Sequence, residues 1–351
     1  METHVTVPGH ISDTALNTTD DQAGHQLTTR QGWRRFTVAP LAPPAPLSTE
    51  EYERLEPLQR QLYDEDRLDH HGRLRVVATS TVRHTVTCGR RLVLLNKHAI
   101  SARRGLIVSG PAGTGKTIAI TQLGQAHELL DQARHPHATD RIPVVYITVP
   151  PAATARMVAA EFARFLGLPV RRSSNITDII EAVVGVCTDT RTGLILVDEL
   201  HNISLTSRSG AEVADTLKYF SERIPATFVY AGIDIEHSNL LSGTRGQQIA
   251  GRFTLIPTNP FPYNEEWKGL VATLEGTLLL HRHRTGTLTR LDRYLHERTG
   301  GMIGALSHAI RGAAIDAVLT GEEAITQRSL DAVPLDHVAQ SLPRRTAGSR
   351  R

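Results

Sequence analysis

A glycine-rich loop between a strand and a helix constrains this chain more than any other feature. The loop reads Gly110, Pro111, Ala112, Gly113, Thr114, Gly115, Lys116 and Thr117. An apolar run at 106–108 leads into it, and apolar residues at helical spacing follow it. Glycines let the backbone curl so that its N–H groups point at phosphate oxygens, and a helix N-terminus adds positive charge. The pattern predicts a nucleotide site, with Lys116 on the β- and γ-phosphates and the Thr117 hydroxyl on Mg²⁺.

Two adjacent carboxylates form the second motif. Asp198 and Glu199 directly follow the apolar run 194–197. Carboxylates at the end of a buried strand are costly unless they face a ligand. In P-loop ATPases this is the Walker B arrangement, in which the aspartate helps to hold Mg²⁺ and the glutamate orients or deprotonates the attacking water. We therefore predict ATP and Mg²⁺ as cofactors, Asp198 with Thr117 as metal ligands, and Glu199 and Lys116 as catalytic residues.

Three weaker signals lie near the later strands. Arg252 precedes the last predicted strand, where an arginine can reach the γ-phosphate of a neighbouring subunit, although an ordinary surface arginine is the alternative. Asp234 is the one candidate for contacting the γ-phosphate after the fourth strand, and a solvated loop carboxylate is the competing interpretation. His201 and Asn202 either couple the nucleotide to a neighbouring subunit or form a hydrogen-bonded turn.

Strands and helices alternate through the middle of the chain. Strands are predicted at 106–109, 143–149, 194–198, 227–231 and 253–256. Segments with helical spacing lie between them, and this alternation predicts a parallel sheet flanked by helices. After Pro260 and Pro262 the apolar spacing is helical throughout, which predicts a small all-helical lid.

Five regions are expected along the chain. They are a disordered N-terminal arm (1–47), a helical N-terminal extension (48–104), the nucleotide-binding α/β core (105–262), the helical lid (263–335) and a basic C-terminal tail (336–351). A capping box at Ser48 and Glu51 starts the extension. The aromatic and basic island 33–36 in the arm either docks to a partner or folds back onto the body.

Two basic segments could contact phosphate. The loop 171–174 suits a DNA backbone, although a solvated surface loop is at least as consistent with it. The tract 281–284, which reads His-Arg-His-Arg, is expected to be a solvated basic loop or a phosphate contact, not a metal site.

Composition limits the class of protein. The chain has 351 residues, 40% of them hydrophobic, and a net charge of only +3, so any DNA contact must come from a local patch. Two cysteines form neither a disulfide framework nor a metal-ligand spacing. No cationic start followed by an apolar stretch is visible, and the longest aliphatic runs are too short to cross a bilayer. A cytoplasmic protein without a membrane partner is expected.

The order of these motifs resembles that of AAA+ ATPases. The run Asp-Glu-Leu-His-Asn at 198–202, together with 224–229 and 248–253, more specifically resembles the TniB family of transposition helper ATPases, over about residues 75–330. The resemblance implies an AAA+ P-loop NTPase fold, in which a parallel sheet flanked by helices is followed by a helical lid. It also implies an ATP-loaded homo-oligomer on duplex DNA that marks a target and recruits a transposase, whose contact stimulates hydrolysis, with Arg252 acting in trans.

Two departures from the AAA+ pattern accompany the resemblance. The end of the fourth strand, at 232–234, has no clear asparagine or threonine sensor, and the lid segment 300–304 lacks the arginine that many AAA+ lids offer to the nucleotide. We therefore expect the monomer to bind nucleotide less tightly, with contacts between subunits completing the site. Alternative functions are a replication ATPase of the helicase-loader type and a regulatory nucleotide switch that oligomerises through its arm.

Overall fold

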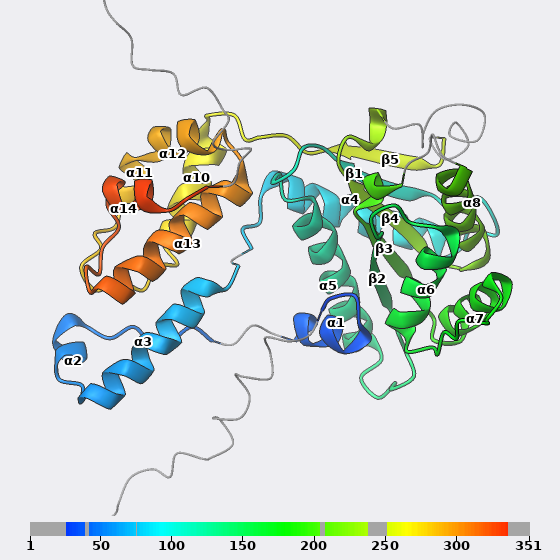
Figure 1. Ribbon diagram of the computed structural model, residues 1–351, viewed down its shortest axis with the longest axis horizontal. Coiled ribbons are helices and arrows are strands. Elements are labelled where there is room, and N and C mark those ends of the chain that lie inside the picture. The colour runs from blue at the N-terminus through cyan, green and yellow to red at the C-terminus, as the bar shows by residue number, and fades with distance from the viewer. Residues whose placement is uncertain (1–25, 39–41, 75, 204–207, 238–250, 336–351) are drawn as a thin grey trace, which may run out of the picture.

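The computed structural model describes residues 26–38, 42–74, 76–203, 208–237 and 251–335. Figure 1 shows an α/β body built around one sheet and, beside it, a smaller body made only of helices. Among the described residues, no single helix is long and apolar enough to cross a membrane. Two consecutive lid helices (292–299 and 303–320) pass that test only when taken together, and they are bent by 118°.

All five predicted strands are present and parallel. They are β1 (Gly105–Ser109), β2 (Val144–Thr148), β3 (Leu194–Asp198), β4 (Thr227–Gly232) and β5 (Phe253–Pro257), in the order β2-β3-β4-β1-β5. Strands β1, β3 and β4 are buried along their whole length, as expected for a parallel sheet covered on both faces. Because every strand runs in the same direction, the carboxyl ends of β1 and β3 meet at one edge, where the phosphate loop begins.

Helices cover both faces of the sheet. They are α4 (Ser80–Asn96), α5 (Lys116–Arg134), α6 (Ala155–Leu166), α7 (Ile176–Asp189) and α8 (Arg208–Arg223). In Figure 1, α5 lies on one side of the strands and α6, α7 and α8 lie on the other. Side chains cap the first turns of α6 and α7, where Thr154 accepts from the Met157 N–H and Asn175 accepts from the Thr177 N–H. The short helices η2 (Leu200–Asn202) and η3 (Ile235–His237) follow β3 and β4.

The expectation of disorder is wrong for part of the N-terminal arm. Residues Arg30–Thr37 form the helix α1, which folds back onto the α/β body and is capped by Thr29. Trp33 is only 2% exposed, and its ring stacks on Tyr146 of β2. The backbone of Phe36 accepts a hydrogen bond of 3.2 Å from Gln125 Nε2. Of the two interpretations of the island, the structure shows the one in which the arm folds back.

The helical body has a hydrophobic core of its own. Its helices are α10 (Glu265–Glu275), α11 (Thr287–Arg290), α12 (Asp292–Thr299), α13 (Ile303–Thr320) and α14 (Gln327–Ala332). Their core includes Trp267, Leu288, Leu295 and Leu306, each fully buried. These helices form the predicted lid.

Two further helices, α2 (Thr49–Glu53) and α3 (Pro57–Gly72), also lie beside the lid (Figure 1). The capping box at Ser48 and Glu51 is present. Helix α3 packs on α13, and Arg311 of α13 donates 3.1 Å to the carbonyl of His71. Helix α4, in contrast, packs on α5 of the α/β body. Residues 48–104 thus divide between the two bodies.

A buried ion-pair network joins α3 to the lid. The Arg67 side chain is fully buried and donates to both oxygens of Glu323, at 2.7 and 2.8 Å. Asp64 also accepts from this guanidinium, and the His281 N–H donates 3.1 Å to Glu323. Burial raises the pKa of Glu323, but these hydrogen bonds outweigh burial and hold the pKa below its usual range. The network ties the N-terminal helices to the lid across 256 sequence positions.

The tract 281–284 contributes to the same packing. The ring of His281 stacks on Tyr52 at 4.4 Å between ring centroids, and His283 Nε2 lies 3.1 Å from a nearly buried oxygen of Glu275. The expectation of a solvated loop is therefore wrong for the two histidines and correct for Arg282 and Arg284, which are exposed.

Replacing Arg67 with methionine is expected to lower the free energy of unfolding by about 3–5 kcal/mol, because removing one partner leaves buried carboxylate charge unpaired. Urea unfolding followed by circular dichroism measures the change. Arg293→Met is the matched control, since the ion pair of Arg293 with Glu297 is exposed and adds little to the free energy of unfolding. Because the pKa of Glu323 is lowered by folding, its stabilising effect is present above the ordinary carboxyl pKa and is lost as the pH falls through the folded value. Equal losses in the two variants would contradict the network's role.

Candidate nucleotide-binding site

The phosphate loop begins where β1 ends and closes where α5 starts. Gly110, Gly113 and Gly115 have φ values of 152°, 75° and 87°, which residues other than glycine rarely adopt. A Cβ atom at Gly110 would lie 1.9 Å from the carbonyl oxygen of Thr258, so this position also needs glycine for space. Thr114 Oγ1 bonds to Thr258 Oγ1 at 2.7 Å. The loop is therefore held in place by the residue that follows β5.

Lys116 is a largely desolvated cation at this loop. Its side chain is 8% exposed, and Nζ donates 2.7 Å to the carbonyl of Pro111. Burial lowers the pKa of Lys116, while the nearby carboxylates of Glu199, Asp198 and Asp234 act in the opposite direction. An anion bound in the loop would replace Pro111 as the acceptor and would relieve the poor solvation of the ammonium group.

Thr117 and Asp198 bring two oxygen ligands together. Thr117 Oγ1 donates 2.7 Å to Asp198 Oδ2, although the two residues lie on α5 and at the end of β3. Asp198 is 3% exposed, and its other oxygen accepts 2.8 Å from the Glu199 N–H. Mg²⁺ favours oxygen ligands and binds through one or two carboxylates together with substrate phosphates and water. This pair fits that ion, and no group of three or more His, Cys, Asp or Glu residues in the described part of the chain forms a separate metal site.

Glu199 occupies a strained backbone position next to Asp198, which bonds to Thr117. Its φ is 57°, an uncommon value for a residue with a side chain, and its carboxylate is 43% exposed. Oε2 lies 3.2 Å from His201 Nδ1, which accepts from the Ile233 N–H at 3.3 Å. Asn202 Nδ2 donates 2.8 Å to the carbonyl of Val149. Within the chain, His201 and Asn202 thus form the hydrogen-bonded turn that links the ends of β2, β3 and β4 near Glu199.

A cavity of about 310 Å³ opens above the phosphate loop. Lys116, Thr117 and Glu199 line its polar end, and the lid contributes Ile303. Its other apolar lining includes Leu74, Val76, Val77, Val82, Ile118 and Ile233, together with Leu274 of the lid. The lid also touches the loop directly, because the Gly304 N–H donates 3.0 Å to the carbonyl of Gly113. A cavity that is charged at one end and apolar at the other suits a phosphorylated ligand with an apolar or aromatic part.

Asp234, the residue predicted to contact the γ-phosphate, follows the end of β4. Asp234 is exposed and has a φ of 44°. The more buried polar group there is Ser109, which bonds to Glu236 and accepts 2.8 Å from the Ile235 N–H. Ser109 and Thr258 did not appear among the sequence candidates, because their roles depend on contacts between strands far apart in the sequence.

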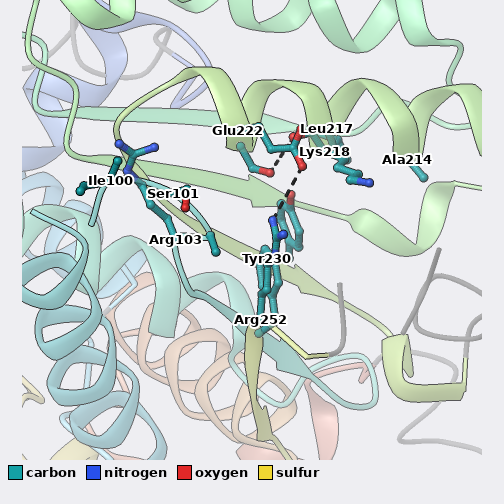
Figure 2. Close-up of a pocket in the computed structure, with 12 residues that line it drawn as sticks. Ile100, Ser101, Arg103, Ala214, Leu217, Lys218, Glu222, Tyr230 and Arg252 are labelled. Atoms are coloured by element: carbon teal, nitrogen blue, oxygen red, sulfur yellow. Dashed lines mark hydrogen bonds and ion pairs between the residues drawn. The ribbon is translucent and has the colours of Figure 1, made fainter. Parts of the chain in front are cut away.

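Arg252 lies at the opposite end of the sheet from the phosphate loop. The Arg252 carbonyl accepts 3.0 Å from the N–H of Gly105, which is the first residue of β1. The phosphate loop, in contrast, follows the last residue of β1. A strand of this length spans about 16 Å, at roughly 3.3 Å per residue. Figure 2 shows Arg252 beside a cavity of about 290 Å³, with Arg103 and Lys218 also on its wall. Its guanidinium is 40% exposed and lies 3.7 Å from Glu222. It is therefore placed to face outward, away from the nucleotide cavity of its own chain.

The parallel sheet, the phosphate loop, the acidic pair at the end of β3 and the helical lid together define the AAA+ ATPase fold. The family model described as bacterial TniB protein matches residues 79–263, more than half of the chain, and the chain belongs to this family. A search of curated proteins finds no match.

Solved structures share the fold at low sequence identity. The ORC1 protein of Aeropyrum pernix in complex with DNA is 13% identical, with a TM-score of 0.56 over 73% of this chain and 65% of that one, slightly less than two thirds of its length. The ORC2 protein of the same organism in its ADP form is 15% identical, with a TM-score of 0.57 over 78% and 74%. Drosophila ORC bound to DNA is 15% identical, with a TM-score of 0.51 over 86% and 72%.

Proposed function

We propose that this chain binds and hydrolyses ATP, assembles as a homo-oligomer on duplex DNA, and assists transposition by selecting a target and recruiting a transposase. The observation that carries the proposal is the convergence of Lys116, Thr117 and Glu199 at the polar end of one cavity, with Asp198 hydrogen-bonded to Thr117 beside them. Membership of the TniB family supports the role in transposition.

The reaction assigned to this site is attack of water on the γ-phosphate, which breaks the bond to the β–γ bridging oxygen and releases ADP and phosphate. Lys116 would bind the β- and γ-phosphate oxygens in place of the Pro111 carbonyl. Thr117 and Asp198 would hold Mg²⁺, which neutralises charge on the phosphates when it is bound. Glu199, half-exposed beside them, would orient the water and accept its proton. Arg252 would stabilise transition-state charge in the site of a neighbouring copy, because it faces away from its own cavity.

The loop 171–174 is the candidate for contact with the DNA backbone. Arg171 and Arg172 are exposed. Arg156 donates to their carbonyl oxygens at 3.0 and 3.1 Å, so the loop has a defined shape although its arginine side chains reach solvent. Exposed arginine side chains on such a loop can contact phosphates without recognising the base sequence.

Assembly on DNA tests the proposal. The protein with a non-hydrolysable ATP analogue, Mg²⁺ and duplex DNA is expected to sediment as a large complex. The Lys116→Ala variant is expected to sediment as unassembled protein under the same conditions. Replacing both Arg171 and Arg172 with alanine should weaken DNA binding and reduce the slope of log K against log salt by about 1–2, as expected for one or two lost phosphate contacts. If the wild-type protein binds the nucleotide but forms no DNA complex, the regulatory-switch alternative is favoured instead.

A further inference from the structure

We infer that Tyr146 is a positioning residue for Asp198, and that Trp33 of α1 holds Tyr146 in place, so that the N-terminal helix supports the metal-binding end of the site. The inference rests on the proposed role of Asp198 in binding Mg²⁺. It assigns a function to a tyrosine in a buried strand and to the docking of α1, neither of which the reaction described above uses.

Tyr146 reaches Asp198 across the sheet. Register pairs Asp198 of β3 with Thr148 of β2, two residues beyond Tyr146 on the same strand face. The long phenol side chain covers that distance, and its hydroxyl donates 3.0 Å to Asp198 Oδ2. This is the same oxygen that accepts from Thr117 at 2.7 Å. Because both oxygens of an ionised carboxylate can only accept, the phenol O–H is the donor in this bond.

Two donors on one carboxylate oxygen fix the orientation of the carboxylate. Bound Mg²⁺ would draw a lone pair of the Thr117 hydroxyl, so the direction of its O–H would depend on the ion. The Tyr146 hydroxyl would hold Asp198 Oδ2 from the other strand whichever way the threonine turns. Partners of this kind orient metal ligands, and their loss typically weakens metal binding about 10–100-fold.

Trp33 closes off the other side of the tyrosine ring. The two rings stack at 5.8 Å between centroids with planes 14° apart, and Trp33 is 2% exposed. The indole also fills the space above Gly124 of α5, where a Cβ would lie 2.6 Å from the ring. Glycine at this position therefore admits α1 to the surface that covers Tyr146. With Trp33 removed, the ring would gain freedom to leave Asp198.

Tyr146→Phe removes only the hydroxyl and is the first test. The concentration of Mg²⁺ needed for half-maximal binding of a fluorescent ATP analogue is expected to rise about tenfold, whereas binding of that analogue in EDTA should not change. The control is Tyr263→Phe, which removes a similar 2.9 Å phenol–carboxylate bond, to Asp292, in the lid. An unchanged Mg²⁺ requirement, or an equal loss in EDTA, overturns the inference. A wild-type protein with no Mg²⁺-dependent binding would instead overturn the proposed function.

The second test addresses Trp33. Trp33→Leu should raise the Mg²⁺ requirement in the same direction by a smaller factor, and Trp33→Phe, which keeps an aromatic ring on Tyr146, should restore it. Combining Trp33→Leu with Tyr146→Phe should add nothing to Tyr146→Phe alone, because the tryptophan acts through the hydroxyl. Additive effects on the Mg²⁺ requirement would show that Trp33 acts independently and would overturn its assigned role.

Discussion

Replacing Arg252 with alanine is expected to reduce ATP turnover in the assembled protein by about 10³–10⁵-fold, the range over which arginine fingers stabilise phosphoryl-transfer transition states. Nucleotide affinity of the isolated chain should stay unchanged, because Arg252 lies at the far end of β1 from its own phosphate loop. Phosphate release and equilibrium binding of a fluorescent ATP analogue measure the two properties.

Arg103→Ala is the matched control for this prediction. Arg103 lines the same cavity as Arg252 (Figure 2). A much smaller loss is expected from Arg103→Ala, since the Arg103 guanidinium donates 3.3 Å to the carbonyl of Ala99 in its own chain. Equal losses in both variants would point to a nonspecific effect of cations on assembly and not to a finger at Arg252.

Replacing Glu199 with glutamine is expected to slow hydrolysis by about 10²–10⁴-fold, which is the usual contribution of a general base. The amide keeps the shape of the side chain but cannot accept a proton from water. ATP binding should survive, because Lys116 and Thr117 are unchanged, and the variant should accumulate in its ATP-bound assembly on DNA. Single-turnover phosphate release separates the loss of chemistry from any loss of binding.

Asp234→Asn is the informative comparison for Glu199. Asp234 is an exposed carboxylate close enough to influence Lys116, yet it follows β4 and makes no contact with Thr117 or Asp198 among the described hydrogen bonds. A modest effect is expected from its replacement. If Asp234→Asn stopped turnover while Glu199→Gln did not, the catalytic carboxylate would be Asp234.

The local parts of the fold could be predicted from sequence because their signals are local. Strands β1, β3 and β4 are short, mainly apolar runs that are buried along their whole length, and the phosphate loop is defined by glycines that the backbone needs at positive φ. Helix α1 was not predicted because its sequence is strongly polar. The burial of Trp33 against Tyr146 and Gly124 and the hydrogen bond from Gln125 to Phe36 stabilise it there, and both are tertiary effects.

Contacts between distant residues account for the other differences. The pairing of Arg67 with Glu323 places α3 on the lid, and no nearby sequence signal marks either residue as a partner. The candidate site also combines residues with local sequence signals and residues placed by distant contacts. Thr117, Asp198 and Glu199 could be identified from motifs, whereas Tyr146 and Thr258 join the site only through strand register and strand order.

In the proposed assembly, Arg252 of one copy completes the nucleotide site of another. Mixing two inactive variants tests this shared site. Glu199→Gln lacks the proposed catalytic base but still binds ATP, assembles and retains Arg252, and Arg252→Ala retains the nucleotide site but lacks the arginine. ATP turnover measured across mixing ratios is predicted to rise well above either variant alone and to peak at intermediate ratios. Turnover that stays at the level of the separate variants at every ratio, with mixed assemblies verified by sedimentation, would contradict a shared site.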